Sequence, residues 1–291
     1  MRTISYVVPP EYDGAKLYTF LRSYMKISLT LLRSLKRVEN GLLLNGEHAR
    51  TVDIIHMGDT VSVNIPDEKI NTIPLDYPLD IVYEDEDLLV INKPGNLAMH
   101  ESHNHQGDAL SNAVASYLMK NGKSAAFRCV GRLDKGTSGL VICALNAHAA
   151  ARLAGNFEKT YVAVATGKYE KSGCIIKPIY RPDPIKTYRV CDDRGDYAET
   201  HYEVLQSGSN YSLLKVQLAT GRTHQIRVHF AYLGTPLYGD TMYGKADEDI
   251  GRQALHCQSV SFVHPVLGKR LEFFAELPEE MQKLLERLSK E

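Results

Sequence analysis

From residue 81 onward, the chain repeats short β-rich runs that helical segments rarely separate. The runs are LLVINK, LVICAL, YVAVATG, THYEVL, YSLLKVQLAT, HQIRVHF and SVSFVHP, and the main helical patterns are DALSNAVASYLMK, AHAAARLAGNF and PEEMQKLLERLSK. Strands that outnumber helices, without regular strand–helix alternation, are typical of α+β proteins. We therefore expect residues 80–291 to form one domain with a mixed, mostly antiparallel β-sheet flanked by helices.

A small separate α/β module is expected over residues 12–65, followed by a linker over 66–79 that contains three prolines. Apolar residues within 17–24 recur at helical spacing, and Ser28 is a suitable N-cap for a second helix. Asn45 and Gly46 then predict a hairpin turn, and the alternation in DTVSVNI predicts a strand.

Basic residues cluster in this module although the formal net charge of the chain is only −1. The six bases are Lys16, Arg22, Lys26, Arg33, Lys36 and Arg37, with no acidic residue between the first and the last. Bases on two short helices can bind RNA phosphates, and a solvated helical face is the alternative. The order helix, helix, hairpin also resembles the S4 RNA-binding module, which favours contact with RNA.

The remaining composition indicates a protein of a reducing compartment, expected to be cytoplasmic. The five cysteines are odd in number and include no C-x-x-C pair, so neither a disulfide framework nor a cysteine zinc site is indicated. We expect no signal peptide, because the N-terminal residues lack a basic start followed by an apolar stretch, and no apolar run is long enough to span a membrane.

A glycine-rich loop between two β-rich runs carries charged side chains. Residues 130–145 read VGRLDKGTSGLVICAL, so Arg132 and Asp134 stand between Gly131 and Gly136. Loops at strand edges often hold catalytic residues, and a neighbouring arginine favours the ionised form of an aspartate. A polar turn with a salt bridge explains the same residues equally well.

Two further segments concentrate polar or aromatic residues in expected strands. In LATGRTHQIRVHF, residues 218–230, alternation would send Arg222, His224, Ile226 and Val228 to one face and Thr223, Gln225, Arg227 and His229 to the other. An anionic ligand or a buried carboxylate would supply the partners that these side chains need, and a structural ion-pair network is the alternative. In EKTYVAVATG, residues 158–167, Tyr161 taken alone would be interpreted as a packing residue.

Six motifs in order resemble the RluA-type pseudouridine synthase family. They are NKPGNLAMH (92–100), GRLDKGTSGL (131–140), EKTYVAVATG, TGRTHQIRVHF, GTPLYGD (234–240) and RQALHCQSVSFVHPVLGKRLEFFAELP (252–278). The resemblance runs from about residue 81 to residue 278, and six ordered motifs over that length make chance agreement very improbable.

The resemblance implies a role for each motif residue. Asp134 would be the catalytic aspartate, and Arg132 and Arg227 would line the pocket, with Arg227 paired to the Asp134 carboxylate. Tyr161 would lie against the target base. The rest of TGRTHQ, which includes Arg222, His224 and Gln225, would support the pocket and the RNA. Gly131 departs from the family, which most often has histidine there, and this departure concerns substrate geometry rather than the aspartate chemistry.

The reaction implied is the isomerisation of uridine to pseudouridine, which consumes no water and oxidises nothing. No cofactor and no metal are therefore expected. His100, His103 and His105 cluster in HESHNH, but no fourth ligand is evident, and we interpret the segment as a polar loop near the RNA.

RNA is the expected partner, with large-subunit ribosomal RNA first and transfer RNA second. A catalytically silent RNA-binding or ribosome-assembly protein on the same scaffold is the competing function. Retention of Asp134, Arg132, Tyr161 and Arg227 together favours the active enzyme. A monomer without membrane attachment is expected.

Overall fold

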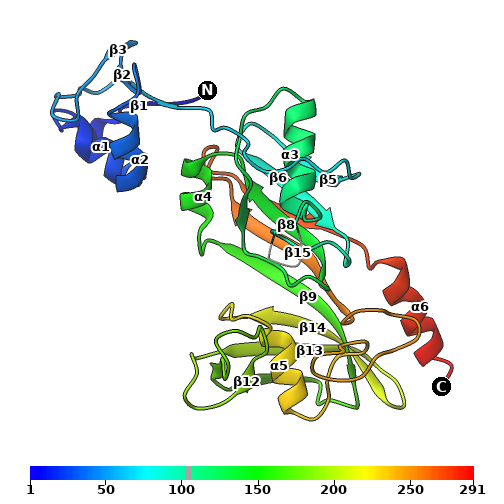
Figure 1. Ribbon diagram of the computed structural model, residues 1–291. Coiled ribbons are helices and arrows are strands. Elements are labelled where there is room, and N and C mark those ends of the chain that lie inside the picture. The colour runs from blue at the N-terminus through cyan, green and yellow to red at the C-terminus, as the bar shows by residue number, and fades with distance from the viewer. Residues whose placement is uncertain (102–105) are drawn as a thin grey trace.

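A computed structural model describes residues 1–101 and 106–291. Figure 1 shows a small N-terminal module at one end of an elongated larger domain. Within the described residues, no helix is both long and apolar enough to cross a bilayer.

The module has two helices packed on a four-stranded sheet. Its elements are β1 (Arg2–Val7), a 3₁₀ turn (Pro10–Tyr12), α1 (Leu17–Ser23), α2 (Leu29–Leu35), β2 (Leu42–Leu44), β3 (Glu47–His48) and β4 (Thr60–Ile65). The strand order is β1-β4-β2-β3. Because β1 pairs along the whole of β4, the module begins about ten residues before the expected start at residue 12.

Local sequence signals in the module match its structure. The Ser28 hydroxyl accepts a hydrogen bond from the Leu31 N–H at 3.1 Å, as an N-cap should. Asn45 and Gly46 have φ angles of 53° and 86°, the left-handed pair that a tight hairpin turn requires. The module joins the larger domain partly through Arg2, whose Nε and Nη2 donate to the Asp87 carboxylate at 3.0 and 2.8 Å.

The larger domain is built on a ten-stranded mixed sheet, as expected. The strands are β5 (Asp80–Glu84), β6 (Leu88–Lys93), β7 (Arg128–Val130), β8 (Ser138–Ala144), β9 (Phe157–Thr166), β10 (Ser172–Ile176), β13 (Glu199–Ser207), β14 (Tyr211–Leu218), β15 (Leu255–Val263) and β16 (Arg270–Phe274). The main order is β10-β13-β14-β9-β15-β8-β6-β5, with β7 beside β8 and β16 beside β15. Among these described strands, β15 and β8 pair in parallel, and the other pairs are antiparallel.

The parallel pair joins the two halves of the sheet. Gly139 at the start of β8 has a φ of 106°, and a Cβ there would lie 2.2 Å from the backbone oxygen of Cys257 in β15. Only glycine permits so close an approach. The loop that carries Asp134 ends at this junction, so the sheet fixes where the loop can lie.

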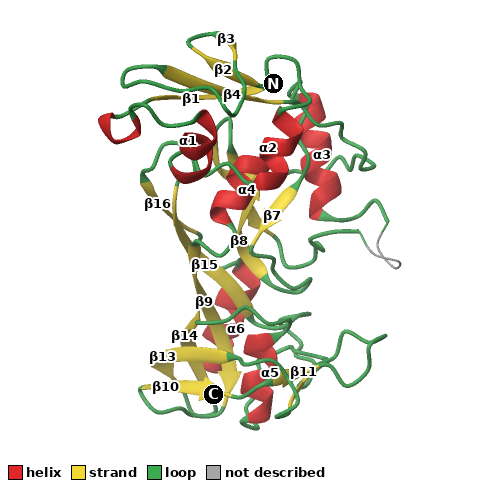
Figure 2. Ribbon diagram, turned by 90° about the vertical axis from the view of Figure 1, so that its left-hand side faces the viewer, coloured by secondary structure: helices red, strands yellow, loops and turns green. Residues whose placement is uncertain are grey.

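In the part of the domain that the structure describes, four helices flank the sheet, together with the short pair β11 (Ile179–Tyr180) and β12 (Val190–Cys191). They are α3 (Leu110–Lys120), α4 (Ala147–Leu153), α5 (Gln225–Tyr232) and α6 (Glu279–Leu288). Figures 1 and 2 place α3 and α4 beside the half that carries β6 and β8, and α5 beside the other half. The three expected helical segments correspond to α3, α4 and α6.

The expected strand over residues 218–230 is wrong, because only Leu218 belongs to a strand. β14 ends at Leu218, and the chain then turns and forms helix α5 from Gln225. His224 is the N-cap residue that precedes this helix, and it adopts the left-handed conformation with a φ of 60°. The helix matters for the site, because residues three apart share a helical face whereas alternation in a strand would separate His224 from Arg227.

Candidate active site

Asp134 lies in the loop between β7 and β8, as its motif predicts. The Thr137 N–H donates to the backbone oxygen of Asp134 at 3.0 Å, which closes a tight turn. The Asp134 side chain is only 16% exposed. The turn thus presents one carboxylate from a rigid loop at the central junction of the sheet.

Arg227 on α5 faces this carboxylate but is held mainly by another one. Its Nη1 lies 3.6 Å from Asp134 Oδ2, whereas its Nε and Nη2 both donate at 2.7 Å to Asp240, a fully buried carboxylate. Burial disfavours the charged guanidinium, but the hydrogen bonds and charge of Asp240, helped by Asp134, raise the pKa of Arg227 above its ordinary value. Arg227 is therefore a fixed cation beside Asp134.

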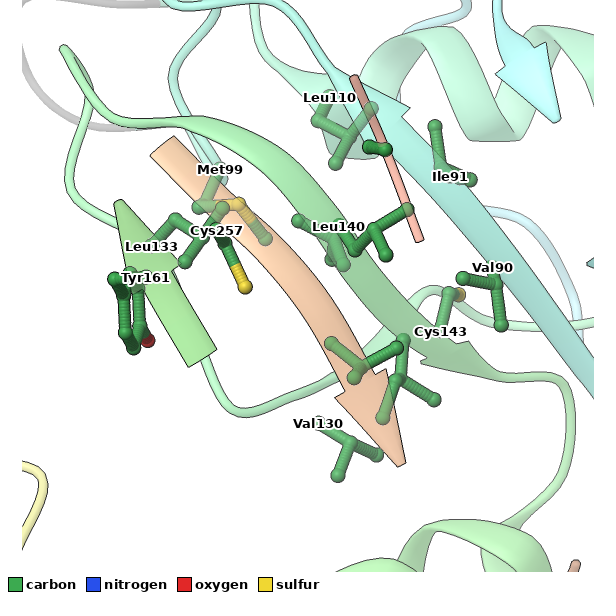
Figure 3. Packing of buried hydrophobic residues seen from close by; sticks show 14 of the residues in the cluster. Val90, Ile91, Met99, Leu110, Val130, Leu133, Leu140, Cys143, Tyr161 and Cys257 are labelled. Carbon is green, nitrogen blue, oxygen red and sulfur yellow. The ribbon is translucent and has the colours of Figure 1, made fainter. Parts of the chain in front are cut away.

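Tyr161 in β9 supplies the aromatic wall of the site. Its side chain packs at the edge of the main core cluster, and Figure 3 shows it near Leu133 and Cys257. Burial raises the pKa of the phenol well above its usual value, and the Asp134 charge acts in the same direction. Tyr161 therefore stays neutral at physiological pH.

His224 is the second group of α5 that faces Asp134. Its Nε2 lies 4.0 Å from Asp134 Oδ2, and its Nδ1 lies 2.9 Å from the Tyr243 hydroxyl. Burial lowers the pKa of His224, and Asp134 opposes that effect without reversing it. His224 is thus a neutral imidazole at pH 7, with one nitrogen anchored and the other toward the carboxylate.

These side chains line a small cavity of about 100 Å³ that meets a wider groove of about 1220 Å³. Arg132, Asp134, His224 and Arg227 line both spaces, so they stand where the two meet. Arg132 is the exposed member of this set. Among the described residues, Asp134 is the only carboxylate that lines the small cavity.

Two basic side chains that the sequence analysis did not single out support the Asp134 loop, the buried Lys93 and the partly buried Arg252. Lys93 Nζ donates to the carbonyls of Pro94, Leu97 and Lys135 at 2.8, 2.8 and 3.3 Å. Burial lowers the pKa of Lys93 to about 7, while three carbonyl acceptors favour its charged form.

Arg252 holds the end of the same loop. Its Nη1 donates to the Gly136 carbonyl at 2.9 Å, and its Nη2 donates to the Ser138 hydroxyl at 3.0 Å. Three supporting residues fall inside the quoted motifs: Lys93 in NKP, Arg252 in RQALHC and Asp240 in GTPLYGD. No periodicity in the sequence shows what these side chains contact.

Gln225 requires a correction, because the structure buries it. Its oxygen accepts from the Thr220 hydroxyl and the Arg222 N–H, and its nitrogen donates to the Glu199 carbonyl and the Thr200 hydroxyl. The amide has no capacity left for the expected RNA contact. Gln225 instead fixes the turn that places His224 and Arg227.

Arg222 and the bases of the module are available at the surface. Arg222 is 42% exposed, with Nη1 at 3.4 Å from Asp196. Of the six bases between Lys16 and Arg37, all are exposed except Arg22, which is half-buried and donates to the Ile27 carbonyl. None of the six forms an ion pair with another described residue.

The histidine cluster considered for a metal is only partly visible. His100 packs edge-on against the Phe127 ring at 5.1 Å between centroids, and burial lowers its pKa. His103 and His105 lie outside the described residues.

Comparisons with known proteins agree on one family. The model of a family described as RNA pseudouridylate synthase matches residues 87–232. RNA pseudouridine synthase YjbO of Bacillus subtilis is 39% identical over 268 residues, which covers 89% of this chain and 94% of that protein. Ribosomal large subunit pseudouridine synthase D of Zymomonas mobilis is 34% identical over 313 residues, covering 99% and 98%.

The fold is also similar to that of a solved structure. Human RNA pseudouridylate synthase domain containing 4 matches with a TM-score of 0.58 and 25% identity, over 72% of this chain and 92% of that one.

Proposed function

The chain belongs to the RluA-type RNA pseudouridine synthases, and from this premise we propose that it isomerises uridines of large-subunit ribosomal RNA with Asp134 as the catalytic carboxylate. The observation that carries this assignment is Asp134, the single carboxylate that the described residues contribute to the small cavity, flanked by Arg227 at 3.6 Å and by Tyr161. Uridine isomerisation breaks the N1–C1′ bond and makes a C5–C1′ bond without consuming water.

One carboxylate suits this chemistry better than hydrolysis. Cleavage of a glycosidic bond develops positive charge at C1′, which an adjacent carboxylate stabilises or attacks. Hydrolytic glycosidases add a second carboxylate to protonate the leaving group or activate water. Here the other nearby carboxylate, Asp240, is buried and committed to Arg227. Attack at C1′ and proton removal at C2′ both need the same carboxylate, Asp134.

The other side chains have complementary roles. Arg227 orients the Asp134 carboxylate, which lies 3.6 Å from its Nη1. Tyr161 offers a neutral ring to an extruded uracil, and such stacking contributes about 1–3 kcal/mol per base. Arg132 and Arg222, which are exposed and line the cavity, would bind phosphates of the RNA near the target nucleotide.

Large-subunit ribosomal RNA is proposed because relatives that cover nearly the whole chain carry it in their names. Pseudouridine synthase D proteins of Zymomonas mobilis and Vibrio cholerae are 34% and 35% identical to it. The exposed bases of the S4-like module, Lys16, Lys26, Arg33, Lys36 and Arg37, would add a second phosphate-binding surface.

Mapping pseudouridines in cells tests this proposal. RNA from cells that lack the protein should lose specific pseudouridines in large-subunit ribosomal RNA. The wild-type gene should restore them, and a gene carrying Asp134→Asn should not. Losses confined to transfer RNA would overturn the substrate assignment. An unchanged map would instead favour a silent RNA-binding protein.

A further inference from the structure

Pseudouridine formation leaves a proton that some group must remove. When C5 of the uracil bonds to C1′, C5 still carries its hydrogen and the ring holds an N1=C6 double bond. A base then takes the C5 proton, the C–H electron pair restores the C5=C6 double bond, and N1 gains a proton. The step balances without oxidation, but it needs a proton acceptor beside C5.

Few groups at the small cavity can accept a proton near neutral pH. Its titratable side chains among the described residues are Arg132, Asp134, Tyr161, Arg222, His224 and Arg227. The three arginines remain charged throughout the physiological range. Tyr161 is already a neutral phenol and has no basic site. Asp134 is released when C5 bonds to C1′, but in the proposed mechanism it lies at the sugar rather than beside C5.

The geometry points to His224 as the base that removes the C5 proton, and we propose this role, which rests on the isomerase function above. Its Nε2 faces the cavity 4.0 Å from Asp134 Oδ2, and the side chain is only 10% exposed. A nucleotide whose C1′ contacts Asp134 would therefore bring its base within reach of the same imidazole. Neutral histidine is the group best matched to proton transfer at pH 7.

The neighbours of His224 fix the orientation of its imidazole ring. Its Nδ1 contacts the Tyr243 hydroxyl at 2.9 Å, and that hydroxyl also accepts from the Arg189 N–H at 3.0 Å. With hydrogen on Nδ1, the Nε2 lone pair faces the cavity. The charged groups that act on His224 are Asp134 and Asp240, which favour its protonated form, and Arg227 and Arg189, which oppose it.

His224→Asn removes Nε2 and changes little else. Asparagine tolerates the left-handed conformation that position 224 adopts, and its amide can still reach Tyr243. Single-turnover formation of pseudouridine should fall roughly 10²-fold or more. His201→Asn is the matched control, since His201 lies on β13 and is 50% exposed, away from the cavity. That variant should keep the wild-type rate.

The decisive readout is an isotope effect rather than the rate alone. Unmodified large-subunit ribosomal RNA would be transcribed with hydrogen or with deuterium at C5 of its uridines. In His224→Asn, proton removal becomes the slow step, so deuterium should slow the reaction much more than in the wild type. A slow variant with the wild-type isotope effect would overturn the proposal, and so would an unimpaired variant. Wild-type protein that forms no pseudouridine would instead refute the proposed substrate.

Discussion

The buried pair between Arg227 and Asp240 predicts that Asp240→Asn damages both stability and catalysis. Removing one partner of a buried ion pair costs about 3–5 kcal/mol. The asparagine oxygen can still accept from the Met242 and Tyr243 N–H groups, which contact Asp240 Oδ1 at 3.1 and 3.2 Å. We therefore expect the free energy of unfolding to fall by about 3 kcal/mol, the lower end of this range. At about 2–4 °C per kcal/mol, Tm should fall by roughly 6–12 °C.

The catalytic effect follows from where the released guanidinium goes. Without Asp240, the nearest carboxylate for Arg227 is Asp134, 3.6 Å away, so the two side chains move together and the catalytic carboxylate is displaced. A displacement of about 1 Å can cost roughly 10²-fold in rate. RNA affinity should change little, because Asp240 is buried.

Thermal unfolding and single-turnover pseudouridine formation at saturating RNA measure the two effects. Asp76→Asn is the matched control, because it breaks an ion pair with Lys120 in which the aspartate side chain is 85% exposed. Such surface pairs contribute little, so its Tm and rate should stay near wild type. If Asp240→Asn behaved like this control, our account of how Arg227 is held would be wrong.

Three further predictions concern the site and the core. Arg227→Lys should lose most activity, because one ammonium cannot replace a planar fork that bridges two carboxylates; a near-normal single-turnover rate would contradict this. Gly131→His should lower Tm and activity, because position 131 has a φ of 68° and a Cβ there would lie 2.4 Å from the Phe157 ring. Adding Phe157→Ala should recover part of both, and no recovery would show that the ring is not the obstacle. Burial lowers the pKa of His148 and His256 to about 4, below the unfolded value of about 6.5. The unfolded chain then binds more protons between these values, so the free energy of unfolding should fall as pH drops from about 6.5 to 4; urea titrations that show no such fall would refute this.

Local signals explain why much of the fold could be predicted from the sequence. The cap at Ser28 and the turn at Asn45 and Gly46 depend only on neighbouring residues, and both are confirmed. The strands of the mixed sheet could also be predicted, because each carries its own β-branched and apolar pattern.

Helix α5 could not be predicted in this way. Ile226 and Val228 favour a strand locally, but tertiary contacts decide otherwise. Gln225 hydrogen-bonds to Glu199 and Thr200 on β13, and this anchors the first turn of the helix. No pattern within residues 218–230 contains that information.

The candidate site, too, could be predicted only in part from the sequence. The motif resemblance identified Asp134, Arg227 and Tyr161, and the structure brings these side chains around one cavity. The motif resemblance did not identify Asp240, which holds Arg227, or Lys93, which holds the Asp134 loop. A buried carboxylate thirteen residues after Arg227 has no signature in spacing or charge.

Tritium release from RNA labelled at C5 of its uridines tests the central role of Asp134 most directly. Wild-type protein should release tritium as pseudouridine forms. Asp134→Asn should bind the same RNA with unchanged affinity and release none above background. Measurable release by that variant would contradict the account, because the cavity holds no other carboxylate among the described residues to take its place.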